Sequence, residues 1–191
     1  MPKFTPNRLF IQALKGTIGD LVFYEDADGN SIIQRKGKRK VPPSEKQLGS
    51  NDRFKLAAVY GKMVQADPVL SAEYRPLCRG RMAPYHVALR DFLTPPKLVA
   101  IDLQSFSGQP GQLIRMIATD DSRVLSVQVV VRHAISQAII EQGASGPSVI
   151  ADQWLYTTRT VIRSGTPVLL EATAADRPGN LGAANMHFII P

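Results

Sequence analysis

The chain has 191 residues, of which 44% are hydrophobic and 20% are charged, as is typical of a globular protein that buries a core. Its formal net charge is +7, and its one cysteine, Cys78, excludes an internal disulfide. Residues 1–11 lack the apolar core of a signal peptide, and no segment approaches the ~18 consecutive apolar residues of a membrane span. We therefore expect a protein that is cytoplasmic at synthesis, has no membrane partner, and can end up in an assembled particle.

The charge is unevenly distributed along the chain. Residues 1–97 contain 17 basic and 9 acidic side chains, a net of +8, whereas the remainder contains 6 and 7, a net of −1. Such an asymmetry favours two domains, one of which faces an anionic partner, although clustering without a binding role gives the same pattern. With the proline pair Pro95-Pro96 as the boundary, we predict a basic domain over residues 1–96 and a second domain over residues 97–191.

The first domain is predicted to begin with an N-terminal arm and a β-hairpin. Residues 18–25 and 31–36 are rich in β-branched and aromatic side chains, and they flank the turn sequence of residues 26–30. Gly29 tolerates positive φ, and acidic side chains in this segment can close a turn. Because a two-stranded ribbon is only marginally stable alone, we expect it to pack on something else.

About three helices are predicted next. Ser44 and Gln47 have the spacing of a capping box before a long segment with helical periodicity. Asp67 before Pro68 is an N-cap signal for a short second helix, and Pro84 can open a third. The residues expected to face inward are Leu48, Phe54, Ala57, Ala58, Gly61, Val64, Val87, Ala88 and Phe92.

In the second domain, apolar residues alternate along the chain. The clearest example is residues 124–133, where Leu125, Val127, Val129 and Val131 are predicted to share one face. About seven short strands are predicted, over residues 98–103, 114–118, 124–133, 138–141, 154–161, 168–174 and 186–190. So many strands in about 95 residues predict an antiparallel immunoglobulin-like β-sandwich, which makes the whole chain α+β.

Two stretches of the second domain resemble bacterial immunoglobulin-like modules. Residues 118–124 (ATDDSRV) resemble the strand-turn-strand unit of these modules, and residues 174–180 (AADRPGN) resemble the turn near their end. Trp154 opens an intervening strand, as an inner-face aromatic residue often does. The resemblance covers about residues 97–191 and implies adhesion, spacing or decoration of assemblies, including phage-like particles, although fold alone does not fix function.

The first domain resembles a group of uncharacterised bacterial proteins, and this resemblance implies no known activity. The residues that carry it are Gly16-Thr17-Ile18-Gly19, Gly29, Arg35, Gln47-Leu48 and Arg53-Phe54.

The sequence lacks the local signatures of catalysis. It has no Gly-x-Ser-x-Gly elbow, no P-loop and no dinucleotide fingerprint. His86, His133 and His187 are far apart, and none belongs to a pair with metal-ligand spacing. We therefore predict a protein that is not an enzyme and that has no catalytic residues, no cofactor, no metal and no small-molecule substrate.

Calcium binding is a separate question that the sequence leaves open. Asp120, Asp121 and Asp176 with Asn180 stand at the ends of predicted strands, where hard oxygen ligands can converge if the loops are neighbours. Acidic residues are, however, also the ordinary choice for turns.

The remaining candidate site is a basic cluster formed by Arg35, Lys36, Lys38, Arg39 and Lys40. These five cations in six residues can bind phosphates of a nucleic acid or dock on an acidic protein surface. The same charges can also deter edge-to-edge pairing of strands.

The predicted function is that of a non-enzymatic structural or interaction protein, a subunit of a larger particle, fibre or phage-like assembly. Its expected partner is itself or another protein of the assembly. The alternative is a nucleic-acid-binding protein that uses the basic cluster.

Overall fold

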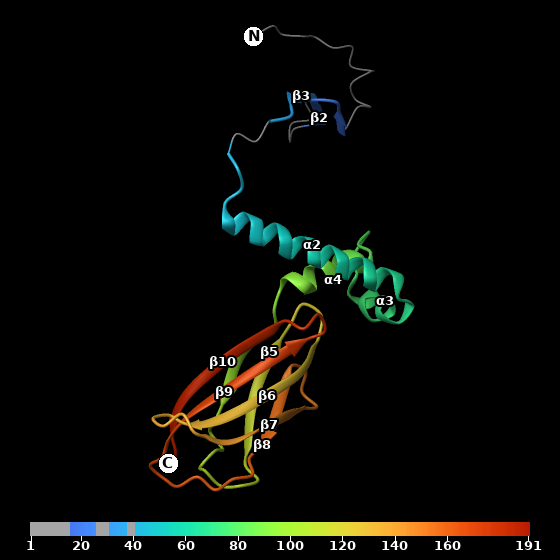
Figure 1. Ribbon diagram of the computed structural model, residues 1–191. Coiled ribbons are helices and arrows are strands. Elements are labelled where there is room, and N and C mark those ends of the chain that lie inside the picture. The colour runs from blue at the N-terminus through green and yellow to red at the C-terminus, as the bar shows by residue number, and fades with distance from the viewer. Residues whose placement is uncertain (1–15, 26–30, 38–40) are drawn as a thin grey trace. The chain divides into compact units, whose positions relative to one another are not determined.

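The computed structural model describes residues 16–25, 31–37 and 41–191 (Figure 1). The chain divides into two compact units, Met1–Lys46 and Gln47–Pro191. The boundary predicted at residue 96 thus falls within the second unit, and as a domain boundary it stays a prediction.

The first unit contains a three-stranded antiparallel sheet, in the order β1-β2-β3. Its strands are β1 (Gly16–Ile18), β2 (Leu21–Glu25) and β3 (Ser31–Arg35). The pairing of β2 with β3 confirms the predicted hairpin, whose turn lies outside the described residues. The prediction of one strand over residues 18–25 is wrong. Gly19, with a φ of +59°, lets the chain reverse within two residues, so Ile18 pairs with Leu21.

The described residues form three α-helices, as predicted: α2 (Glu45–Ala66), α3 (Pro68–Tyr74) and α4 (Pro84–Leu93). Asp67 caps α3, because its Oδ1 accepts hydrogen bonds from the amides of Val69 and Leu70 in the first turn of that helix. A short 3₁₀ helix, η1 (Arg75–Leu77), follows α3 where Pro76 interrupts it. None of the helices in the described ranges combines the length and the apolarity that a bilayer-spanning helix requires.

The three helices share a small core that is formed by Val64, Tyr74, Val87 and Ala88. Gly61 lets α2 approach α4 closely, because a Cβ atom there would lie 2.8 Å from the Tyr85 ring. Of the residues predicted to face inward, Leu48 and Phe54 are exposed, since they lie on the part of α2 before its first buried residue.

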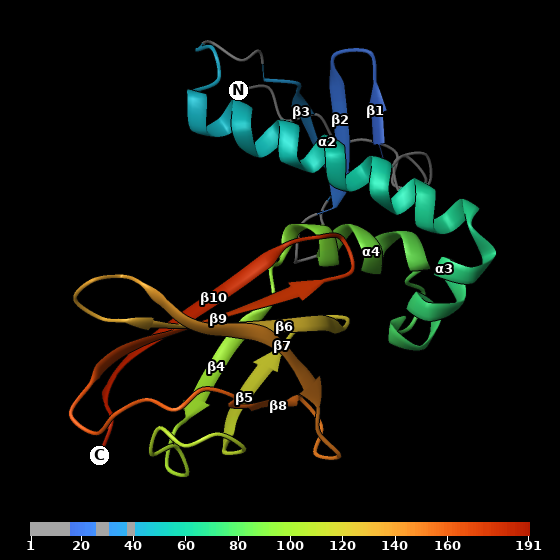
Figure 2. The same ribbon diagram turned by 60° about the horizontal axis from the view of Figure 1, so that its bottom comes forward.

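The second unit also contains a seven-stranded antiparallel sheet, which confirms the predicted number of strands. Its order is β10-β9-β6-β7-β8-β5-β4, and its two end strands, β10 and β4, contact each other (Figures 1 and 2). The strands are β4 (Lys97–Asp102), β5 (Leu113–Thr119), β6 (Val124–His133), β7 (Ile139–Pro147), β8 (Gln153–Thr157), β9 (Pro167–Asp176) and β10 (Leu181–Ile189).

Strand β7 connects two groups of strands within this sheet. It pairs with β6 as far as Ser145 and with β8 at Gly146 and Pro147. The alternating apolar side chains of both groups meet in one core, in which Trp154 is buried as expected for an inner-face aromatic residue. The sheet is therefore nearly closed on itself around that core.

The inward alternation predicted for β6 holds for three of the four apolar residues that were expected to share one face. Val127, Val129 and Val131 are buried, whereas Leu125 is exposed. The register of β6 against β9 shifts between Val124 and Ser126, and this bulge turns Leu125 outward. The mixed α+β class is thus confirmed, while the immunoglobulin-like sandwich stays a prediction.

Candidate functional site

The predicted basic site is only partly within the described residues. Arg35 ends β3 and Lys36 follows it, and both are exposed. The Lys36 amide donates a 2.7 Å hydrogen bond to the Asp20 carbonyl, which extends the β2–β3 pairing. Lys38, Arg39 and Lys40 lie outside the described residues, so binding by this cluster stays a prediction.

The ribbon formed by β1, β2 and β3 has apolar side chains on both faces and no buried residue among those described. Its pairing places Ile18, Leu21, Phe23 and Ile33 on one face. Three of these side chains are exposed, and Phe23 is half-buried. The described part of the ribbon therefore has no core of its own.

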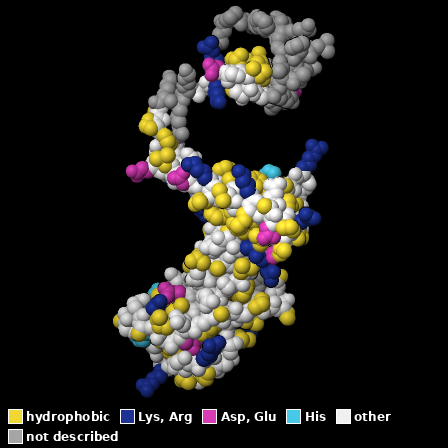
Figure 3. Space-filling model, turned by 45° about the vertical axis from the view of Figure 1, so that its right-hand side comes forward, with side chains coloured by type: hydrophobic (Ala, Val, Ile, Leu, Met, Phe, Trp, Pro, Cys, Tyr) yellow, Lys and Arg dark blue, Asp and Glu magenta, His cyan; other side chains and the backbone are white. Residues whose placement is uncertain are grey.

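Helix α2 has a second apolar surface besides the one that packs on α4. Leu56, Val59 and Met63 are three and four residues apart, so they form one stripe along the helix. Their exposed fractions are 60%, 65% and 49%, although the opposite side of α2 is buried at Ala57 and Val64. Figure 3 shows hydrophobic side chains at the surface of the helical region, interspersed with Lys and Arg. We call Leu56, Val59 and Met63 the α2 stripe.

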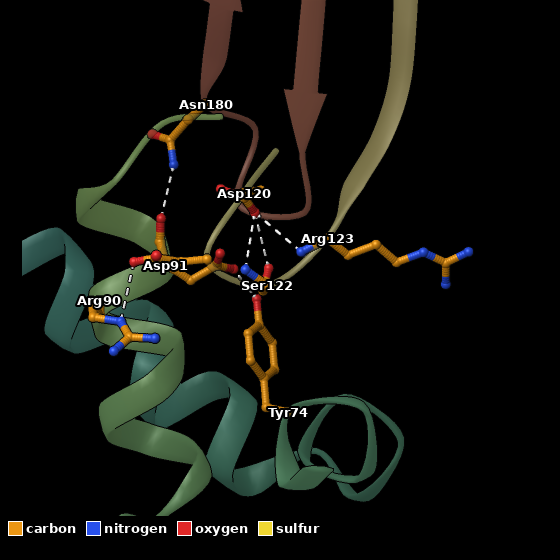
Figure 4. Close-up of polar contacts among 8 residues, drawn as sticks. Tyr74, Arg90, Asp91, Asp120, Ser122, Arg123 and Asn180 are labelled. Carbon is orange, nitrogen blue, oxygen red and sulfur yellow. Dashed lines mark hydrogen bonds and ion pairs between the residues drawn. The ribbon is translucent and has the colours of Figure 1, made fainter. Parts of the chain in front are cut away.

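Three aspartates converge where the helices meet the end of the sheet. Asp91 of α4, Asp120 after β5 and Asp176 at the end of β9 each place a carboxylate oxygen within 4.8 Å of the others. We call these three residues the carboxylate cluster, of which Figure 4 shows Asp91 and Asp120. The pairing of Val124 with Asp176 between β6 and β9 explains why the two loops meet.

Asp91, in the last turn of α4, is completely buried. It follows Val87 by four residues and Ala88 by three, so it lies on the packed side of α4. Its Oδ2 accepts a 2.5 Å hydrogen bond from the hydroxyl of Tyr74, whose oxygen lies 2.9 Å from that of Tyr60. Its Oδ1 has no hydrogen-bond partner among the described residues.

Asp120 shapes the turn between β5 and β6. Its Oδ2 accepts hydrogen bonds from the amides of Ser122 and Arg123, at 3.3 and 3.1 Å. The Ser122 hydroxyl donates a 3.2 Å hydrogen bond to the same oxygen, and it lies close enough to Asp91 to lower the pKa of that carboxyl, against the larger effect of burial. Its single proton can be donated to only one of the two carboxylates at a time. Oδ1 of Asp120 is buried without a partner among the described residues.

Asp176 closes the turn between β9 and β10. Its Oδ1 accepts from the amides of Gly179 and Asn180, at 2.9 and 2.6 Å. The Asn180 side chain donates to Oδ2 of Asp176 at 2.8 Å and to the Asp91 carbonyl at 3.2 Å. Asn180 thus joins the turn to α4.

The cluster carries more negative charge than its surroundings offset. The nearby arginines pair with other acids, Arg90 with Asp121 at 3.1 Å and Arg177 with Glu73. Within the described ranges, no lysine or arginine forms an ion pair with any of the three aspartates. Two carboxylates at such separations repel each other by on the order of 3 kcal/mol at an effective dielectric constant of 20.

This environment makes the carboxylates of Asp91 and Asp176 easier to protonate. Burial raises the pKa of Asp91 to about 6, and the charges of Asp120 and Asp176 act in the same direction. Burial likewise raises the pKa of Asp176, although the hydrogen bonds from Asn180 oppose the change. The proton and a metal cation therefore compete for the same oxygen atoms.

The structure brings together some of the residues that the sequence offered as possible calcium ligands. Asp120, Asp176 and Asn180 meet, whereas Asp121 points to Arg90 instead. Sequence reasoning did not identify Asp91. The available signal was a carboxylate on the apolar side of a helix, between residues already expected to face inward.

Comparisons with known proteins find little that is similar. No known protein family and no curated protein matches the chain. Among solved structures, superoxide reductase (neelaredoxin) from Ignicoccus hospitalis aligns at 12% identity with a TM-score of 0.33, covering 51% of this chain and 82% of its own. A variant of that protein aligns at 12% identity with a TM-score of 0.34, covering 51% and 80%. Similarities this distant carry no argument about the function of this chain.

Proposed function

We propose that the chain is a non-enzymatic interaction protein that assembles with further copies of itself into a larger particle or fibre. The observation that carries the proposal is the absence of any buried residue in the described part of the ribbon. A small sheet needs a packed face to be stable in water. An assembly partner supplies that face.

The α2 stripe supports the same proposal from the other unit. Leu56, Val59 and Met63 expose a row of apolar side chains of the kind that marks interaction surfaces. One chain therefore carries two apolar surfaces that need cover, and a second copy offers both. In the assembly, the ribbon of one copy packs on the α2 stripe of a neighbour.

The nearly closed sheet is then the part that projects from the assembly. In this proposal it serves as an immunoglobulin-like module, as the resemblance of residues 97–191 to bacterial modules implies. Such a module spaces or decorates the particle and needs no catalytic residue of its own.

The experiment is light scattering coupled to size-exclusion chromatography of the full chain over a wide range of concentrations. We expect oligomers that shift to monomers in Val59→Asp, because a charge in the α2 stripe opposes its burial. Ile33→Asp tests the ribbon in the same way. Val149→Asp is the matched control, since Val149 is fully exposed outside both surfaces.

Two results count against this proposal. One is a wild-type chain that stays monomeric at the highest concentrations. The other is a Val149→Asp protein that dissociates as readily as Val59→Asp.

A second candidate function is nucleic-acid binding, and one observation favours it. Arg35 and Lys36 are exposed at the end of β3, and Arg35 lies on the ribbon face that carries Phe23. A cation beside an aromatic ring suits a single-stranded nucleic acid. Binding of labelled DNA and RNA should weaken as salt increases, and neutralising Arg35 and Lys36 should reduce that salt dependence. Failure to bind at low salt would remove this candidate.

A further inference from the structure

The carboxylate cluster has two features that hydrogen bonding within the protein does not explain. Asp91 is completely buried, yet its Oδ1 has no partner in the described parts of the chain. Oδ1 of Asp120, a second member of the same cluster, is buried and unpartnered as well. Buried carboxylate oxygens are ordinarily satisfied, so two in one place indicate a missing electropositive partner.

That partner must supply charge as well as contacts. Arg90 and Arg177, the arginines at this end of the sheet, are occupied by Asp121 and Glu73. In Figure 4 the side chain of Arg123 extends away from the cluster. A bound cation neutralises the three aspartates and saturates the free oxygens at once.

The chemistry of the donor atoms identifies the class of cation. Carboxylate, hydroxyl and amide oxygens are hard ligands, which suit calcium or magnesium rather than zinc or copper. Oxygens on opposite sides of a calcium ion are about 4.6–5.2 Å apart, whereas those around magnesium are about 4.2 Å apart. The cluster oxygens lie within 4.8 Å of one another, so they can bind one ion together. The longer and more flexible coordination of calcium suits carboxylates that the surrounding turns already hold in place.

From these observations we propose that Asp91, Asp120 and Asp176 form a calcium-binding site. The ion binds the carboxylates of α4 and of two strand ends at the same time, so it fastens the helices to the sheet. Ser122 can add a hydroxyl ligand, and solvent completes the coordination. A pocket of about 290 Å³ is lined, among others, by Tyr74 and Ser122, which donate hydrogen bonds to Asp91 and Asp120. This site does not depend on self-assembly.

The test is calorimetric titration of CaCl₂ into the full chain after treatment with a chelator and dialysis into metal-free buffer. We expect one calcium ion per chain and a higher melting temperature with calcium than without it. MgCl₂ at the same ionic strength should bind at least tenfold more weakly. No heat of binding and no shift in melting temperature for the wild-type chain would overturn the proposal.

Asp120→Asn is the informative variant. An asparagine keeps an oxygen for the amides of Ser122 and Arg123, so the turn is preserved. Its amide group replaces the unpartnered oxygen and can donate to Asp91. We expect calcium affinity to fall at least tenfold, while the metal-free protein melts at the same or a higher temperature than the wild type.

Asp121→Asn is the matched control, since it removes the same charge from the adjacent residue but touches only Arg90. It should bind calcium as the wild type does. If Asp121→Asn loses as much affinity as Asp120→Asn, binding reflects general negative charge and the assignment is wrong. If Asp120→Asn binds like the wild type, the cluster is not the site. Asp91→Asn provides a second variant should Asp120→Asn fail to fold.

Discussion

Tyr74 donates its hydroxyl proton to Oδ2 of Asp91 across 2.5 Å, and both residues are buried. Because Tyr74 has only one such proton, the 2.9 Å contact with Tyr60 is a hydrogen bond that Tyr60 donates. The resulting chain of hydrogen bonds runs from α2 through α3 to α4. It ends on a carboxylate that faces the strand ends, so the helical core and the carboxylate cluster depend on each other.

Replacing Tyr74 with phenylalanine should therefore destabilise the second unit. Tyr74→Phe keeps the ring but leaves Oδ2 of Asp91 and the Tyr60 hydroxyl without their partner. We expect the free energy of unfolding to fall by about 1–3 kcal/mol, as for other buried polar groups that lose a hydrogen bond. Urea denaturation in the presence of a chelator measures the change without any contribution from bound metal.

Tyr85→Phe is the control for this prediction. Tyr85 belongs to α4 and packs on His86 and Gly61, but its hydroxyl has no hydrogen-bond partner in the described ranges. Its loss should change the free energy of unfolding by less than about 0.5 kcal/mol. Equal effects of the two substitutions would show that the bond from Tyr74 to Asp91 contributes nothing specific.

The metal-free protein should lose stability as the pH rises. Burial raises the pKa of Asp91 from 3.8 to about 6, so the folded protein holds this proton more tightly than the unfolded chain does. The stability due to a raised pKa is fully present below the unfolded value and is lost as the pH rises through about 6. The difference corresponds to roughly 3 kcal/mol between pH 4 and pH 7 as an upper limit.

One substitution tests whether Asp91 causes this loss of stability with rising pH. Asp91 faces Tyr74 of α3, Asp120 after β5 and Asp176 of β9, and Asp176 contributes a weaker change of the same sign. In chelator, denaturation curves between pH 4 and pH 7 should show a steep decline for the wild type and a shallow one for Asp91→Asn. The same decline in both proteins would place the titrating group elsewhere.

The positions of the strands could be predicted from the sequence because alternation reports directly which residues face the core. Val127, Val129 and Val131 follow it throughout. Leu125 does not, since a bulge changes the face of a residue without changing the sequence period. Gly19 ends a strand that composition alone extends, because its positive φ permits a two-residue turn.

The candidate site could be predicted only in part, for a different reason. Asp120 and Asp176 stand out at strand ends, but their meeting requires β6 to pair with β9, which spacing along the chain does not state. Asp91 comes from a helix that precedes the whole sheet. Its convergence with the other two depends on how α4 packs against the strand ends, which is a tertiary property.

Close contact between β10 and the end of the proline segment leads to a further prediction. A Cβ atom on Gly182 would lie 1.8 Å from the Pro96 carbonyl oxygen, and backbone cannot move aside as a flexible side chain can. Gly182→Ala should therefore cost about 3 kcal/mol or more and lower the melting temperature by several degrees. Gly146→Ala in β7 is the control, since nothing lies within 4 Å of a Cβ there. Comparable melting temperatures for both variants would contradict the close approach.

Glu141 provides a last test, of a buried acid that acts through hydrogen bonds rather than through charge. Its Oε2 accepts from the amides of Arg159 and Thr160, at 3.0 and 2.8 Å, and so holds the segment that follows β8. Glu141→Gln keeps an acceptor oxygen and should change the free energy of unfolding by less than about 1 kcal/mol. Glu141→Ala leaves two amides without their acceptor and should cost about 2–3 kcal/mol. If urea denaturation shows that Glu141→Gln and Glu141→Ala are destabilised by the same amount, the negative charge of Glu141 matters and its two hydrogen bonds do not.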